Sequence, residues 1–76
     1  MAPALPVIKP KECLRALERA GFFIDHQTGS HARLLHRTRP ELRVTLPIHN
    51  KDIPLGTLRN ILRQAGLSSE QFLELL

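Results

Sequence analysis

Apolar residues recur at helical spacing in three parts of the chain. The first part begins at Pro10, where positions i, i+1, i+4 and i+7 form one stripe: Cys13, Leu14, Leu17 and Ala20. Proline is favoured in the first turn of a helix, and Gly21 is suited to end it. The pattern therefore predicts an amphipathic helix over residues 10–20.

Two further helical patterns lie in the last third of the chain. Over residues 54–65, five apolar residues share one helical face: Leu55, Leu58, Ile61, Leu62 and Ala65. Gly66 is suited to end this helix. Ser68 and Gln71 then have the spacing of a capping box, so we expect a third, short helix to follow Ser68.

Between the first two helices, apolar and polar residues alternate with a period of two, as in strands. The alternation predicts three short strands, at 22–26, 31–37 and 42–47, joined by the turn-forming segments QTGS and TRPE. Because both connections are short, consecutive strands are expected to pair in antiparallel fashion.

The alternation also assigns the two faces of this sheet. Three residues of the third strand should face the helices: Leu42, Val44 and Leu46. In the second strand, the side that faces the helices is made by Ala32, Leu34 and His36. The opposite, solvent-exposed side carries His31, Arg33, Leu35 and Arg37, continued by Arg43 and Thr45 of the third strand.

The order of these elements predicts an α+β fold: α-β-β-β-α with a short extra C-terminal helix, over a three-stranded antiparallel sheet. A chain of 76 residues suffices for one domain. We place that domain at residues 9–76, and we expect residues 1–8 to be a lead-in with some flexibility.

The positive charge of the chain is concentrated in its middle third. The net charge is +4, and residues 29–51 hold five basic side chains against Glu41 alone: Arg33, Arg37, Arg39, Arg43 and Lys51. A basic patch on an open sheet face suggests a polyanionic partner, most often a nucleic acid. The alternative is a solvated basic face that only aids solubility.

Composition limits the other possibilities. A single cysteine, Cys13, excludes an intrachain disulfide, and no apolar run approaches the length of a membrane span. We therefore expect a cytoplasmic protein. The sequence contains no C-x-x-C or H-x-x-x-H spacing, and His31 and His36 fall on opposite faces of their strand, so neither a metal site nor another cofactor is expected.

Five short motifs in order resemble the HicA family of toxins, and the resemblance covers residues 9 to 70. They are Gly21-Phe22, Gly29-Ser30-His31, Pro47-Ile48-His49, Gly56-Thr57-Leu58 and Ala65-Gly66. The resemblance implies a fold similar to a double-stranded-RNA-binding domain. It also implies ribosome-independent cleavage of mRNA and a HicB-type antitoxin as protein partner.

The same resemblance implies that His31 is the catalytic residue of a metal-independent endoribonuclease. The chemistry is suitable, because RNA supplies its own nucleophile, the 2′-OH, and histidine can accept a proton near neutral pH. This chain departs from the family in one respect. The position before Gln27 is often basic in the family, whereas here it is His26.

Six further residues are candidates for RNA contacts, through hydroxyl, imidazole or cationic groups: Ser30, Arg33, Arg37, Arg43, His49 and Lys51. His49 has two interpretations, as a phosphate ligand or second acid–base group, or as a loop residue that binds backbone. We expect no functional role for His36. Two other functions stay open: a non-catalytic RNA-binding module, and a basic domain that docks an acidic protein.

Overall fold

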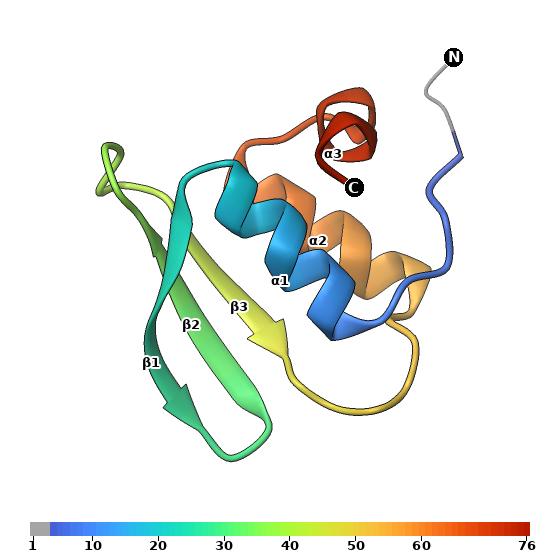
Figure 1. Cartoon of the computed structure of the whole chain (residues 1–76), viewed down its shortest axis with the longest axis horizontal. Helices are drawn as coiled ribbons and strands as arrows, with labels where there is room; N and C mark the ends of the chain where they lie inside the picture. Colours follow the sequence, from blue (N-terminus) through green and yellow to red (C-terminus); the bar gives the residue numbers. More distant parts are fainter. Residues whose placement is uncertain (1–3) are drawn as a thin grey trace.

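A computed structural model describes residues 4–76; residues 1–3, which belong to the expected lead-in, lie outside the described part. The described chain consists, in order, of α1 (Pro10–Arg19), β1 (Phe22–Thr28), β2 (His31–His36), β3 (Arg43–Pro47), α2 (Leu55–Ala65) and α3 (Ser69–Leu75). The strands form one antiparallel sheet in the order β1-β2-β3, and α1 and α2 lie on the same side of it (Figure 1). This confirms the α+β fold with an extra C-terminal helix.

The helix ends follow the chemistry of the terminal residues. Gly66 ends α2 in the left-handed conformation, with φ of 71°, which glycine adopts without steric cost. At α3, the Ser68 hydroxyl accepts a hydrogen bond from the Gln71 backbone N–H, and the Gln71 side chain accepts one from the Ser68 N–H. The capping box is therefore confirmed.

Within residues 4–76, fifteen apolar residues form one buried core between the helices and the sheet. Val44 and Leu46 of β3 and Ala32 and Leu34 of β2 are fully buried, which confirms the predicted helix-facing side. Leu55 lies on the same helical face as the buried residues of α2 but is not part of the core. It is the first residue of the helix and is 47% exposed.

The segment before α1 is attached to the core near its end. Ile8 is buried, and its backbone carbonyl accepts a hydrogen bond of 2.8 Å from the N–H of Ile53, just before α2. Lys9 bridges to the same loop through an ion pair with Asp52 at 3.3 Å. These contacts fix the loop between β3 and α2 beside the start of α1.

A β-bulge at Asp25 changes which way the end of β1 faces. Ile24 pairs with Leu34, whereas His26 pairs with Arg33, so Asp25 has no partner across the ladder. Strict alternation would put His26 on the same side as Ile24, toward the helices. The extra residue instead places His26 beside Arg33 on the open face of the sheet.

Candidate catalytic cleft

His31 begins β2, directly after the two-residue turn of Gly29 and Ser30. Gly29 has a φ of 56°, which suits the first position of such a turn. His31 pairs with Thr28 on one side and with Pro47 on the other. Its side chain is exposed, and the Ser30 hydroxyl lies 3.5 Å from His31 Nδ1.

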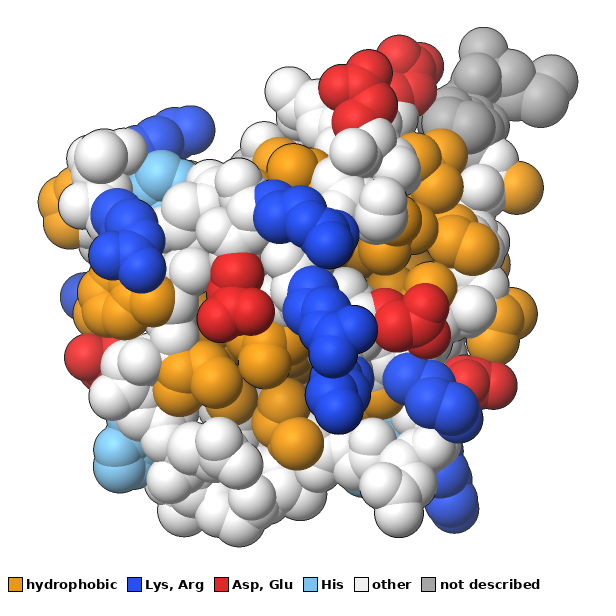
Figure 2. Space-filling model, in the orientation of Figure 1, with side chains coloured by type: hydrophobic (Ala, Val, Ile, Leu, Met, Phe, Trp, Pro, Cys, Tyr) orange, Lys and Arg blue, Asp and Glu red, His pale blue; other side chains and the backbone are white. Residues whose placement is uncertain are grey.

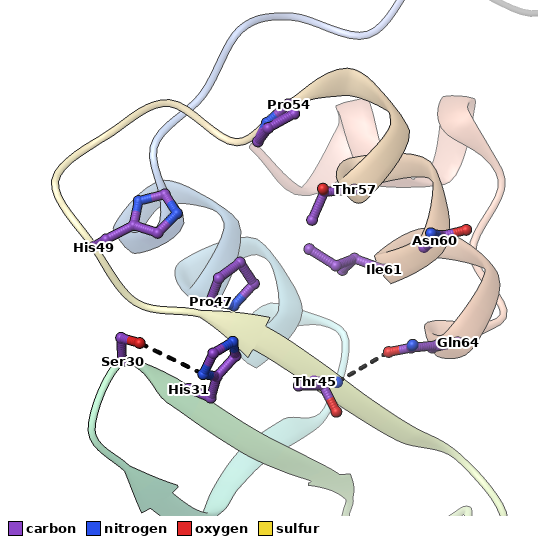
Figure 3. A pocket seen from close by; sticks show the side chains of 10 residues that line it. All are labelled: Ser30, His31, Thr45, Pro47, His49, Pro54, Thr57, Asn60, Ile61 and Gln64. Carbon is purple, nitrogen blue, oxygen red and sulfur yellow. Dashed lines mark hydrogen bonds between the residues drawn. The ribbon is translucent and has the colours of Figure 1, made fainter.

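A cleft of about 510 Å³ opens between His31 and α2. We call it the β3–α2 cleft (Figure 3). Its lining residues come from the start of β2, from β3 and the loop that follows, and from α2: Ser30, His31, Thr45, Pro47, His49, Pro54, Thr57, Asn60, Ile61 and Gln64. The four α2 residues are spaced i, i+3, i+4 and i+7, so they form one stripe of the helix.

His49 lines the same cleft from the loop after β3. Its Nδ1 accepts a hydrogen bond of 3.1 Å from the Lys51 backbone N–H. A neutral imidazole that accepts at Nδ1 carries its proton on Nε2. His49 therefore binds backbone, as one interpretation expected, and its Nε2–H is a hydrogen-bond donor that this contact does not use.

A second, smaller hollow lies on the open sheet face and shares His31 with the cleft. It has a volume of about 180 Å³ and is lined by His26, Thr28, His31, Ala32, Arg33 and Thr45. We call it the His26 hollow. His26 Nε2 lies 2.7 Å from the Thr28 hydroxyl. Because of the bulge, His26 lines the same hollow as His31. The sequence pattern did not predict this bulge.

Comparison with known families now bears on this site. The family model described as the HicA toxin of bacterial toxin–antitoxin systems matches residues 10–67 of the 76-residue chain. The chain belongs to the HicA toxin family. The matched range includes every residue that lines the β3–α2 cleft and the His26 hollow. No curated protein matches the chain.

The expected basic residues of this HicA family member occupy different positions around the two hollows. Arg33 lines the His26 hollow, while Arg37, Arg43 and Lys51 line neither hollow. The Arg37 guanidinium lies 5.5 Å from the centre of the Phe23 ring, a cation–π distance. Arg43 and Lys51 are exposed, Arg43 on β3 and Lys51 in the loop beside His49.

Arg39, unlike these residues, forms an ion pair with an acidic neighbour. Its Nε lies 3.2 Å from a carboxylate oxygen of Glu41. A hydrogen bond from its own backbone N–H, together with the contact to Arg39, holds the pKa of Glu41 below its ordinary value. Over the helices, Figure 2 shows Lys and Arg side chains interleaved with Asp and Glu. The open sheet face of this toxin instead presents Arg33 and Arg43 as exposed cations.

His36, the fourth histidine of the toxin, has a structural environment. It is half-buried, and its Nδ1 accepts backbone N–H groups from Thr38 and Arg39, each at 3.2 Å. Its Nε2 donates to the carbonyl of Ala20, and its ring meets Phe22 edge-on at 4.8 Å. Both ring nitrogens are therefore occupied, on the side of the sheet away from His31.

The described residues also bear on a nucleophilic cysteine, a metal site and a membrane-spanning helix. Burial raises the pKa of the Cys13 thiol to about 12, so this thiol is not poised as a nucleophile. Within residues 4–76, no three His, Cys, Asp or Glu side chains come together as a metal-binding group. No helix in this range is long and apolar enough to span a membrane.

Proposed function

We propose that this toxin is a ribosome-independent endoribonuclease that cleaves mRNA in the cytoplasm, with His31 as its catalytic residue. The observation that carries the proposal is the position of His31, an exposed imidazole shared by two hollows, one of which also contains Arg33. A base beside a cation that binds phosphate is the minimum that RNA cleavage needs. Family membership as a toxin agrees with this activity.

In the proposed reaction, His31 takes the proton from a ribose 2′-OH, and the resulting oxygen attacks the adjacent phosphorus. The bond from phosphorus to the 5′ oxygen of the next nucleotide then breaks. The products are a 2′,3′-cyclic phosphate and a 5′-OH, and no metal ion takes part. Ser30, 3.5 Å from His31 Nδ1, is close enough to help orient the imidazole.

We assign His49 the role of donating a hydrogen bond to the phosphate or to the leaving 5′ oxygen, which takes its proton from solvent. The support is its Nε2–H, which the contact between Nδ1 and Lys51 leaves as a donor in the same cleft. Arg33 is the phosphate ligand nearest to His31 in this proposal, since both line the His26 hollow. Arg37, Arg43 and Lys51 extend the phosphate path over the exposed surface.

The direct test is cleavage of a defined RNA in the presence of a chelator. We expect the wild-type toxin to produce 2′,3′-cyclic phosphate ends, and His31→Ala to lower the rate at least about a hundredfold, the usual scale for a general base. A matched RNA with 2′-O-methyl groups should bind and not be cleaved. Binding without cleavage of unmodified RNA would identify a non-catalytic RNA-binding module instead.

We also propose that a HicB-type antitoxin binds this toxin and blocks the cleft, in line with the toxin–antitoxin family match. Adding the antitoxin should stop RNA cleavage at a stoichiometric ratio. Failure to bind RNA even at low salt, together with tight antitoxin binding, would favour the basic protein-interaction domain.

A further inference from the structure

The β3–α2 cleft differs in chemistry from the basic surface beside it. Apart from His31 and His49, its lining side chains are uncharged: hydroxyls, amides and the apolar walls Pro47, Pro54 and Ile61. The His26 hollow, by contrast, contains Arg33. Phosphate groups favour the side with the guanidinium, whereas an aromatic base favours apolar walls with a few polar groups.

One polar group in the cleft has a fixed orientation. The Gln64 Oε1 accepts a hydrogen bond of 2.9 Å from the backbone N–H of Thr45. Because the partner is a backbone donor, the amide must turn its oxygen toward β3, and its NH₂ group is left as the remaining donor. Gln64 and Thr45 both line the cleft, and in Figure 3 His31 lies between His49 and Gln64.

We propose that the part of the β3–α2 cleft beside Gln64 is a nucleobase subsite, and that the Gln64 NH₂ group determines which base it accepts. An NH₂ group that faces the substrate favours uracil or guanine, which present a keto oxygen at C4 and C6, respectively. It disfavours cytosine and adenine, which present an amino group at the same place. This inference rests on the proposed RNA cleavage and adds a basis for substrate selection to it.

One substitution can change the Gln64 NH₂ group and still keep the hydrogen bond from the Thr45 N–H to the Gln64 side chain. In Gln64→Glu, a carboxylate oxygen can still accept the Thr45 N–H, while the donor that faces the substrate becomes an acceptor. Gln64→Met removes both hydrogen-bonding functions. Asn60→Asp adds the same negative charge one turn earlier in the same cleft, without a contact to Thr45, and is the matched control for charge alone.

The experiment uses short RNA strands that are 2′-O-methylated at all sugars but one, so that only one phosphodiester can be cleaved. The bases on either side of that bond are varied in turn. We expect the wild-type toxin to favour uracil or guanine over cytosine and adenine by about tenfold at one of the two positions, on the scale of a base-edge hydrogen bond. Gln64→Glu should reverse this preference, Gln64→Met should abolish it, and Asn60→Asp should retain it.

Equal cleavage of all four bases by the wild-type toxin, or the same preference in Gln64→Glu, would overturn the inference. Failure of the proposed function is distinguishable, because it would appear as no cleavage of any strand. Affinities of the wild type and Gln64→Glu for fully 2′-O-methylated strands would then decide the inference independently. A preference that reverses in binding supports the subsite, and its absence rejects it.

Discussion

His36 and Ala20 are joined by a hydrogen bond of 2.8 Å from the imidazole Nε2 to the backbone carbonyl oxygen. The contact links the end of β2 to the end of α1, over a sequence separation of 16 residues. Since Nδ1 also accepts two backbone N–H groups, the ring satisfies three backbone groups at once. His36 thereby satisfies backbone groups that follow the ends of α1 and β2 and that would otherwise need water as a partner.

The first prediction is that replacing His36 lowers stability and spares RNA cleavage, whereas replacing His31 abolishes cleavage and spares stability. His36→Ala should lower the free energy of unfolding by about 2–4 kcal/mol, because it removes these hydrogen bonds and the edge-on contact with Phe22. His31→Ala should leave it within about 0.5 kcal/mol, because the side chain is exposed. Urea denaturation measures both, and RNA cleavage per folded molecule should survive in His36→Ala alone. Equal destabilisation by the two substitutions would contradict this division of roles.

Gly21 is predicted to tolerate no side chain. Its φ is 103°, and a Cβ at this position would lie 2.7 Å from His36 Nε2. Gly21→Ala should therefore cost about 2 kcal/mol or more in unfolding free energy, from backbone strain and the displaced imidazole. Combining it with His36→Ala separates the two causes. The steric part should vanish in the double variant, whereas additive losses would show that strain alone is responsible.

The salt dependence of RNA affinity should identify the phosphate ligands. Arg33→Ala is expected to weaken RNA binding and to reduce the slope of log K against log salt concentration by about 0.7, the contribution of one neutralised phosphate in a single strand. Arg15, exposed on α1 away from the sheet's open face, is the matched control. Binding titrations between low and moderate salt measure both slopes. The same reduction for Arg15→Ala would show that only net charge matters.

Cys13 should make the fold sensitive to alkaline pH. Its pKa is about 12 in the folded state, against an ordinary value of 9.0. Because the folded state favours the neutral thiol, this contribution to stability is complete below pH 9 and is lost as pH rises toward 12. The unfolding free energy of the wild type should therefore fall more steeply in this range than that of Cys13→Ala. The chain contains no tyrosine to titrate there, and identical slopes would exclude the thiol as the cause.

Much of the fold follows from local patterns, and the exceptions have physical reasons. The capping box at Ser68 and the left-handed Gly66 are set by neighbouring residues, so the sequence predicts these helix boundaries well. Helical periodicity puts Leu55 on the apolar face of α2 but does not say which residues of that face are buried, and Leu55 is 47% exposed. β1 continues to Thr28, beyond its predicted end, because pairing with β2 stabilises residues that alone resemble a turn.

The candidate site was predictable only in part. The motif resemblance indicated Ser30, His31 and His49, and the structure brings them together in one cleft. His26 was not assigned a side, since a bulge depends on register and not on residue type. Gln64 was missed as well, because its role arises from a contact with Thr45 across 19 residues of sequence. A polar stripe of Thr57, Asn60 and Gln64 beside the apolar face of α2 was the available indication.

Both edges of the three-stranded sheet that residues 4–76 form are interrupted in a way that disfavours a further strand. A fourth strand needs an unbroken row of backbone donors and acceptors. At β3, Gln64 already occupies the Thr45 N–H, and Pro47 has no N–H to give. At β1, the extra residue at Asp25 breaks the spacing of the ladder. A second copy or a foreign chain therefore finds a poor template for lengthening this sheet, and we expect a macromolecule to engage the toxin mainly through the side chains of its faces.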